Sequence, residues 1–271
     1  MARFSSGWSW LGHRLSGRPY FATRDVSIGR HVTIGRNVRF HSDRVRIGDG
    51  VVIQDDVQVD ATTFEIGDFG TIYRGCHFPG PGELRIGHNV WIGTRAIIDA
   101  QGEAHLGNNV CIGPHSQLWT HMVFGDTLQG CRFHSRGPLV IEDDAWLGGN
   151  CLVAPVRIGG RCLVLMGSVV TQDLPGDRSF GGSPAADITD KIGPQFEKRS
   201  LKERVTDLEN RLSAFGHRES FQVVTAAAPA QVDRRDVTYF NLTDRTYTKR
   251  GTELEARCIR FLLPEAKFLP A

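Results

Sequence analysis

The 271-residue sequence has little excess of either charge, no Cys-x-x-Cys pair and no long apolar run. A net charge of +2 without a clustered basic patch argues against a nucleic-acid partner. Because no run of about 18 apolar residues occurs and the N-terminus has no continuous apolar stretch, we expect no integral membrane segment. The six scattered cysteines speak against a structural zinc site and favour reduced thiols. We therefore expect a cytoplasmic protein.

What the sequence has in abundance is glycine, with 31 residues, and a six-residue hydrophobic period. Aliphatic residues or phenylalanine recur six apart in seven triplets, at 28, 34, 40; 47, 53, 59; 66, 72, 78; 86, 92, 98; 106, 112, 118; 141, 147, 153; and 158, 164, 170. The steps between triplets are seven, seven, eight, eight, twenty-three and five residues. The irregularity thus always falls at the same one of three corners.

This period predicts three short flat strands per coil, each presenting one inward side chain, stacked at ~4.8 Å per coil into a triangular prism. We expect about seven coils. Glycine follows many of the inward aliphatic residues, and we attribute this to tight corners whose backbone angles glycine adopts cheaply.

The pattern divides the chain into four parts. Residues 1–25, with Trp8, Trp10 and Leu11, are expected to cap the first coil, and 26–190 to form the prism with a long loop at 119–140. Residues 191–216 contain a predicted helix at 196–215, with apolar residues four and three apart. Residues 217–271 form a small α/β appendage, with an alanine-rich linker at 226–230, a strand at 237–242 and a helix at 251–263.

Residues 115–185 resemble the active-site half of the hexapeptide-repeat acyltransferases, in particular the acetyl-CoA-dependent sugar and xenobiotic O-acetyltransferases. The resemblance is carried by Leu-Trp-Thr-His (118–121), Ala-Trp-Leu-Gly-Gly-Asn (145–150), Met-Gly-Ser-Val-Val-Thr-Gln-Asp (166–173) and Gly-Gly-Ser-Pro-Ala (181–185). It implies a mainly β fold, a left-handed parallel β-helix, assembled as a homotrimer. It also implies acetyl-CoA as acyl donor and no metal.

Acyl transfer needs a base for the acceptor's proton and donors for the oxyanion, and a neutral imidazole can be the base. The resemblance makes His121 the catalytic base, at the entry of the loop. His134 on the same loop is a second candidate and, with Trp119 and Asp126, a predicted acceptor contact. His115, at a corner, is interpreted as structural.

The resemblance also nominates a donor site. Trp146 would flank the acyl end of coenzyme A, and Gly148 and Gly149 would let the pantetheine approach the main chain. Gly167, Ser168, Pro184 and Ala185 would line the rest of the groove. Trp91 has a similar local sequence but lies in an earlier coil without the long loop, so we take it as a corner residue.

Two positions depart from the family pattern. Gln172 stands where a lysine often faces a phosphate of coenzyme A, so Arg161 or Arg178 is expected to supply that charge. Residues 154–159 are one residue shorter than the usual turn.

The function expected from the resemblance is transfer of an acetyl or other short acyl group from acyl-CoA to a hydroxyl or amine of a sugar, nucleotide-sugar or polysaccharide precursor. One alternative is a non-catalytic scaffold. Another is a metalloenzyme like γ-carbonic anhydrase, which needs three histidines converging on one zinc. A nucleotidyltransferase is disfavoured because no glycine-rich nucleotide-binding motif precedes the repeat.

Overall fold

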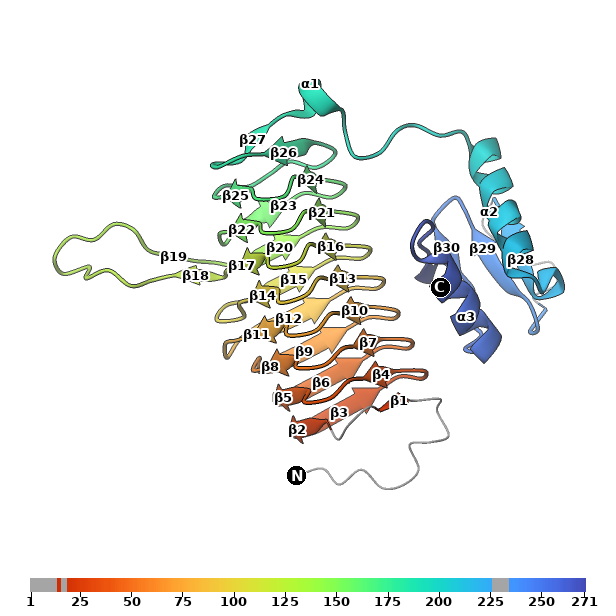
Figure 1. Cartoon of the computed structure of the whole chain (residues 1–271), viewed down its shortest axis with the longest axis horizontal. Coiled ribbons are helices and arrows are strands. Elements are labelled where there is room, and N and C mark those ends of the chain that lie inside the picture. The colour runs from red at the N-terminus through yellow and green to blue at the C-terminus, as the bar shows by residue number, and fades with distance from the viewer. Residues whose placement is uncertain (1–13, 16–18, 226–233) are drawn as a thin grey trace. The chain divides into compact units, whose positions relative to one another are not determined.

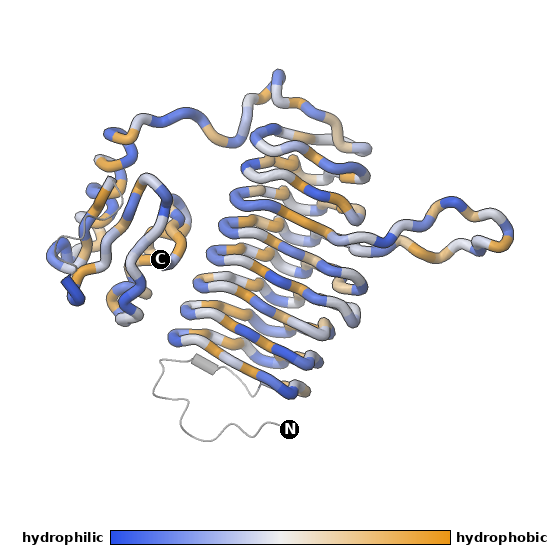
Figure 2. The backbone as a smooth tube through the Cα atoms, turned by 180° about the vertical axis from the view of Figure 1, so that it is seen from behind, coloured by the Kyte–Doolittle hydropathy of each residue, from blue (hydrophilic) through white to orange (hydrophobic). Residues whose placement is uncertain are grey.

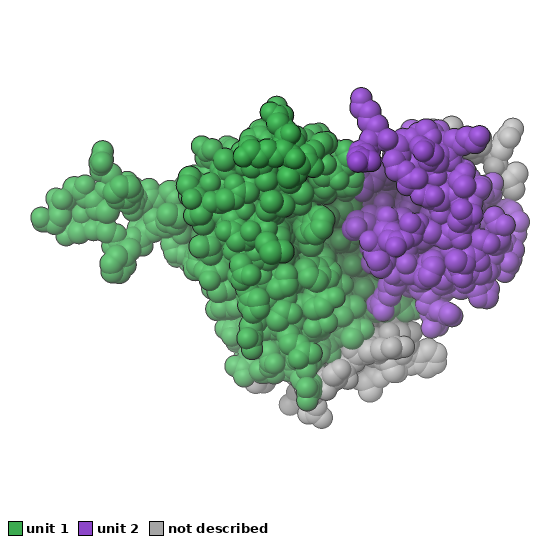
Figure 3. Space-filling model, turned by 45° about the horizontal axis from the view of Figure 1, so that its top comes forward, with its two compact units in different colours: residues 1–196 green, residues 197–271 purple. Residues whose placement is uncertain are grey.

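The computed structural model describes residues 14–15, 19–225 and 234–271. These form two compact units, residues 1–196 and 197–271, coloured separately in Figure 3. The expected cap residues Trp8, Trp10 and Leu11 and the expected linker 226–230 lie outside the described residues. None of the described helices is long and apolar enough to cross a membrane.

The first unit is a prism of three sheets of short parallel strands (Figure 1). Face A is the ten-stranded sheet of β1 (Arg14–Leu15), β4 (Thr33–Ile34), β7 (Val52–Ile53), β10 (Thr71–Ile72), β13 (Trp91–Ile92), β16 (Cys111–Ile112), β21 (Trp146–Leu147), β24 (Leu163–Val164), β26 (Ser179–Gly181) and β27 (Ala186–Asp187), the last of which is antiparallel.

Two further sheets complete the prism. Face B has eight strands: β2 (Tyr20–Ala22), β5 (Arg39–His41), β8 (Gln58–Val59), β11 (His77–Phe78), β14 (Ile97–Ile98), β17 (Gln117–Leu118), β22 (Leu152–Val153) and β25 (Val169–Val170). Face C has seven: β3 (Asp25–Ile28), β6 (Arg44–Ile47), β9 (Thr63–Ile66), β12 (Glu83–Ile86), β15 (Ala104–Leu106), β20 (Leu139–Ile141) and β23 (Arg157–Ile158). The parallel β-helix predicted from the period is confirmed, and its hand stays a prediction.

The inward positions of the repeat form the core. Of the twenty-one residues in the seven triplets, all but Ile28 are buried, and Ile28 packs against the same cluster. Equivalent positions stack in register, as Ile72 does with Ile92. The coil also begins earlier than the first triplet, because β2 pairs with β5 and the rings of Phe21 and Phe40 stack 4.7 Å apart. Along each coil, apolar and polar residues alternate (Figure 2).

The prediction that the repeat glycines are needed for unusual backbone angles is wrong. Gly29, Gly35 and Gly113 do not have positive φ, but a Cβ on any of them would come within 2.3–2.6 Å of atoms of the next coil. Glycine is therefore needed there because stacked coils leave no room for a side chain. The positive φ angles instead occur three residues after the inward residue, at the corners where the chain passes from face C to face A (the C–A corner) and from face A to face B (the A–B corner). These residues are His31, Asn37, Gly50, Asp56, Phe69, Gly75, Asn89, Arg95, Asn109, His115, Asp144, Asn150, Arg161 and Gly167.

The prism closes at its C-terminal end. Residues 182–185 extend face B, since Ala185 N–H donates to Val169 and Val169 N–H donates to Gly182. Helix α1 (Thr189–Ile192) then follows β27.

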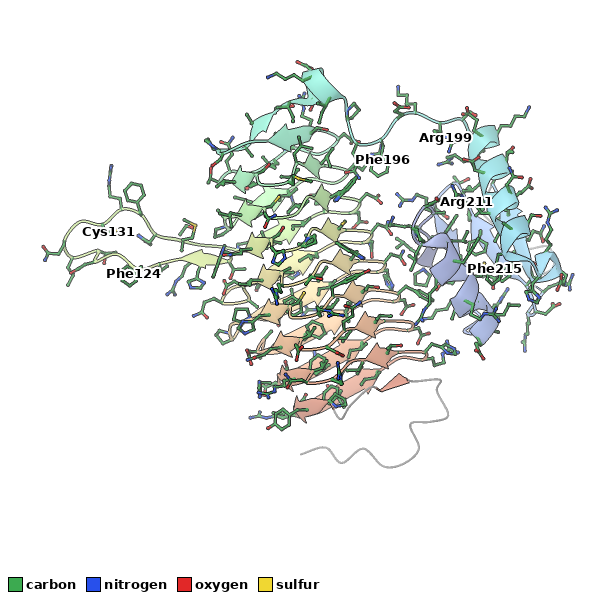
Figure 4. The ribbon with its side chains drawn as sticks, in the orientation of Figure 1. Phe124, Cys131, Phe196, Arg199, Arg211 and Phe215 are labelled. Atoms are coloured by element: carbon green, nitrogen blue, oxygen red, sulfur yellow. The ribbon has the colours of Figure 1, made fainter. Side chains whose placement is uncertain are left out.

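The second unit pairs helix α2 (Leu201–Phe215) with α3 (Glu253–Leu262) and a four-stranded sheet of β28 (Phe221–Val224), β29 (Thr238–Asn241), β30 (Thr246–Tyr247) and β31 (Leu269–Pro270). A 3₁₀ turn, Arg218–Ser220, precedes β28. Helix α2 begins at Leu201 rather than 196, because Ser200 and Glu203 form a capping box. Its buried Leu208 and Leu212 lie on the predicted strip, and α2 contacts α3 and β28 (Figure 4, where Phe215 is labelled).

Candidate active site

The long loop leaves the prism between face B, at β17, and face C, at β20. It forms a hairpin of β18 (His121–Met122) and β19 (Ser135–Arg136) that projects from the side of the rod (Figures 1 and 4). Its outer part exposes large apolar side chains, and Phe124, Leu128 and Phe133 are each at least 85% exposed. The loop base, by contrast, is tied to the prism.

The base of the loop is held by a buried carboxylate, Asp99, which follows the inward Ile98 at the B–C corner. Asp99 is 2% exposed, and its Oδ2 accepts hydrogen bonds from Thr120 N–H at 3.0 Å and from the Thr120 hydroxyl. His121 Nδ1 lies 2.8 Å from the same oxygen. Thr120 is itself buried, and its Oγ1 accepts a hydrogen bond from Gly102 N–H at 2.8 Å. The Thr-His pair thus has a fixed place on the prism.

These contacts fix the proton arrangement of His121. The Thr120 hydroxyl accepts from Gly102 N–H and donates its own proton to the Asp99 carboxylate, which as an ionised group only accepts. Because Asp99 Oδ2 is an acceptor for Thr120, the imidazole Nδ1 must carry a proton and donate to it. The neutral ring then has its lone pair on Nε2. With 29% of its side chain exposed, His121 is a solvent-accessible base oriented by a buried carboxylate.

Asp99 and Thr120 were not identified from the sequence. Ile98 and Leu118 are register partners, so Asp99 and Trp119 occupy equivalent corner positions on adjacent coils. The sequence feature that could have identified Asp99 is an aspartate at the corner one coil before the Thr-His pair. This feature indicates a contact only when the register between the two coils is known.

The other predicted loop residues have different surroundings. The Trp119 ring lies 6.3 Å from the His121 ring, edge-on at 75°, so the two are neighbours. Asp126 Oδ1 accepts from Leu128 N–H at 2.9 Å, and this carboxylate therefore caps a turn of the loop itself. His134 is exposed, and Arg136 lies directly opposite His121 in the hairpin.

The predicted donor residues gather at the A–B corner. Gly148 and Gly149 lie between β21 and β22, and Gly167 and Ser168 occupy the equivalent place one coil later. A Cβ on Gly167 would meet no atom within 4 Å, so open space lies beside this backbone. Ser168 is buried and its hydroxyl donates to Leu165 C=O at 2.6 Å, which makes it part of the corner's frame.

Trp146 differs from Trp91 in exposure, although both point outward from face A. Trp91 packs against Tyr73 with ring centroids 4.8 Å apart, whereas Trp146, two strands further on, is 49% exposed. Only Trp146 offers an uncovered indole beside the glycine-lined corner.

The two arginines proposed for a phosphate lie elsewhere. Arg161 sits at the C–A corner, where its guanidinium pairs with Asp177 at 2.5 Å and lies over the Phe196 ring at 4.4 Å. Arg178, just before β26, pairs with Asp187 at 2.6 Å. The structure thus does not bring these cations to the A–B corner. Pro184 follows a cis peptide bond from Ser183, and Ala185 is buried in the end of the prism.

Face B separates the loop-base residues from the glycines and Trp146. His121 and Asp99 lie at its border with face C, and the glycines and Trp146 lie on the side of face A. An open hollow of about 810 Å³ lies on neither corner, because it is lined by face C and the C–A corner, including Arg85, His105, Glu142 and Arg161. Within this chain, the predicted catalytic residues and the predicted donor residues therefore lie on different sides of face B.

Other chemistries find little support in the described part of the chain. No group of three or more His, Cys, Asp or Glu that could hold a metal occurs there. All six cysteines are free thiols, and burial raises the pKa of Cys76 to about 11 and that of Cys162 to about 12. Such thiols are poor nucleophiles near neutral pH.

The chain shares sequence with known proteins. A family described as "Hexapeptide repeat of succinyl-transferase" matches residues 138–172. The bifunctional protein GlmU of Thermotoga sp. (strain RQ2) is 33% identical over 183 residues, covering 64% of this chain and 34% of that protein, so the chain spans about a third of this relative's length. A 2,3,4,5-tetrahydropyridine-2,6-dicarboxylate N-acetyltransferase of Staphylococcus aureus (strain JH9) is 35% identical over 68 residues, 25% of this chain and 28% of that enzyme.

Among solved structures, a variant of AntD is similar. AntD is an N-acyltransferase from Bacillus cereus, and the variant was solved in complex with dTDP-4-amino-4,6-dideoxyglucose and coenzyme A. It covers 64% of this chain and 92% of its own, with 16% identity and a TM-score of 0.46. The six-residue period, the three parallel sheets and the matched segment together show that the first unit is built from hexapeptide repeats.

Proposed function

We propose that this protein is an acyltransferase that moves an acetyl or other short acyl group from acyl-CoA to a hydroxyl or amine of a sugar, nucleotide sugar or polysaccharide precursor. The observation that carries the proposal is the Asp99–His121 pair, which leaves an accessible neutral Nε2 at the base of the loop. The name of one relative, the N-acetyltransferase of Staphylococcus aureus, agrees with it.

In the proposed reaction, His121 Nε2 takes the proton of the acceptor hydroxyl or amine as its oxygen or nitrogen attacks the thioester carbonyl. The positive charge that forms on the imidazole lies beside the Asp99 carboxylate, which stabilises it. The tetrahedral intermediate then collapses with cleavage of the C–S bond. The thiolate of coenzyme A receives the proton from Nε2, so the enzyme returns to its initial state.

The donor would lie along the A–B corner, where open space lies beside the backbone of Gly167, Gly148 and Gly149 are half-buried, and Trp146 presents its indole. Because this corner and His121 are on opposite sides of face B, we propose that a complete site combines His121 of one protomer with the glycine corner of a neighbour. A closed cyclic trimer is a symmetry that permits this arrangement.

The direct test is coenzyme A release from acetyl-CoA with a panel of sugars, nucleotide sugars and oligosaccharides as acceptors. His121→Gln should reduce acceptor-dependent release by at least ~100-fold, because general base catalysis contributes about 10²–10⁴. A His121→Gln variant with unchanged activity would rule out this mechanism.

Shared sites are tested by complementation. Gly149→Leu should be inactive because it fills the corner, and co-expression with His121→Gln should restore about a quarter of the sites in randomly mixed trimers. No recovery would place both half-sites in one protomer.

A further inference from the structure

Arg136 is set apart from most arginines of the prism by having no acidic partner. The prism arginines that do pair with carboxylates are Arg24, Arg30, Arg36, Arg44, Arg46, Arg85, Arg157, Arg161 and Arg178. Arg136 is exposed, and its side chain makes no hydrogen bond or ion pair with any residue that the structure describes. Its guanidinium is therefore available to an external anion.

The register of the hairpin places Arg136 directly opposite the candidate base. His121 and Arg136 are direct cross-strand partners in the antiparallel pair of β18 and β19. Directly opposite residues have Cβ atoms about 4.5–5.5 Å apart and extend to the same side of the ribbon. Gly137 N–H also donates to Thr120 C=O at 3.2 Å, which ties the returning strand to the anchored Thr120. A group bound at His121 is thus within reach of a long arginine side chain.

The charges around the site favour an anionic ligand at Arg136. The carboxylate that holds His121, Asp99, is 2% exposed and already accepts hydrogen bonds from Thr120 and His121. The only acidic residue within the loop, Asp126, uses its carboxylate to cap the loop's own turn. Neither neutralises Arg136. A planar guanidinium is suited to bidentate recognition of carboxylate or phosphate oxygens.

We propose that the acceptor carries an anionic group, a carboxylate or a phosphate, close to the hydroxyl or amine that is acylated, and that Arg136 binds this group. Arg136 thereby selects the acceptor and orients it toward His121 Nε2. The inference rests on the proposed acyl transfer at His121 and narrows its substrate class.

The test compares three sugars that differ only in the group at carbon 6: glucose, glucuronate with a carboxylate, and glucose 6-phosphate with a phosphate. Binding to the full-length protein is measured by calorimetry or ligand-observed NMR. We expect at least one anionic sugar to bind about 10- to 100-fold more tightly than glucose, the range for hydrogen bonds to a charged group. The anionic sugar that binds more tightly indicates whether the acceptor's charged group is a carboxylate or a phosphate. The gain should disappear in Arg136→Gln and return in part in Arg136→Lys, which restores the charge but not the fork.

Arg132→Gln is the matched control. Arg132 is another exposed arginine of the same loop without a partner among the described residues, but it does not lie opposite His121. It should leave the preference for the anionic sugars unchanged. Equal binding of all three sugars by the native protein, or equal loss in both variants, would overturn the inference.

Two further readouts separate this inference from other roles of Arg136. Weaker acetyl-CoA binding in Arg136→Gln would assign the arginine to the donor's phosphates and overturn the proposal. A rate that falls equally with neutral and anionic acceptors would assign it to the positioning of His121. If coenzyme A release depends on His121 but not on Arg136, only this inference fails, whereas release independent of His121 refutes the acyl-transfer mechanism itself.

Discussion

Replacing Asp99 by asparagine isolates the electrostatic role of this carboxylate. All three of its donors, Thr120 N–H, the Thr120 hydroxyl and His121 Nδ1, meet the same oxygen, Oδ2. The amide oxygen of an asparagine can take that place and keep the three hydrogen bonds. The variant therefore removes the negative charge beside the imidazole and leaves its orientation and proton arrangement as they are.

The expected magnitude follows from the geometry. Two unit charges about 4 Å apart interact by about 4 kcal/mol at an effective dielectric constant of about 20. A barrier increase of this size slows a reaction by about 10³, and solvent at the part-exposed His121 weakens the effect. We expect kcat of Asp99→Asn to fall by about 10²- to 10³-fold, with acetyl-CoA binding unchanged because the donor corner lies across face B.

The assay is acceptor-dependent coenzyme A release, and Asp60→Asn is the matched control. Asp60 occupies the same corner position after Val59 and also contacts histidines, His41 Nδ1 at 2.8 Å and His77 Nε2 at 3.0 Å, but it is on a coil without the loop. Its replacement should leave kcat within about threefold. The reasoning is refuted if Asp99→Asn retains native kcat, or if both variants lose activity equally.

Two predictions concern stability. Gly113→Ala should lower the free energy of unfolding by about 1–3 kcal/mol or more in urea titrations, because its Cβ would lie 2.3 Å from Gly148 C. The control, Gly137→Ala, should change the free energy of unfolding by less than about 0.5 kcal/mol, because its Cβ would meet only Pro155 Cβ at 3.8 Å. Equal effects of the two substitutions would contradict the packing explanation. Hydrogen bonds from the Thr189 side chain and backbone, together with Arg178, lower the pKa of Asp187 from 3.8 to about 2. Because the folded-state pKa is the lower one, this carboxylate stabilises the fold above about pH 4 and loses that contribution as the pH falls toward 2. The Tm difference between the native protein and Asp187→Asn should therefore shrink over that range, and a constant difference would exclude this linkage.

The fold could be predicted from the sequence because the six-residue repeat encodes it locally. An inward side chain every six residues suffices to place the core, and all but one of the twenty-one positions are buried. The role of the glycines was misjudged because it depends on the distance between coils. The clash of a Cβ at Gly35 with Asp55 N, for example, involves residues twenty apart in the sequence.

The candidate site was predictable only in part. His121 could be nominated from its motif, but its partner Asp99 lies one coil earlier and becomes a neighbour only through the register of face B. Arg136 becomes a neighbour through the register of a hairpin with twelve residues between its strands, which no local pattern fixes. The engagement of Arg161 and Arg178 by Asp177 and Asp187 likewise depends on where the last coils end.

Calorimetric titration of acetyl-CoA into the full-length protein, its His121→Ala variant and its Gly149→Leu variant tests the central claim most directly. We predict binding in the micromolar range by the native protein and by His121→Ala, because His121 acts on the acceptor, and loss of binding by Gly149→Leu. Absence of acetyl-CoA binding by the native protein would contradict the account and favour a non-catalytic scaffold.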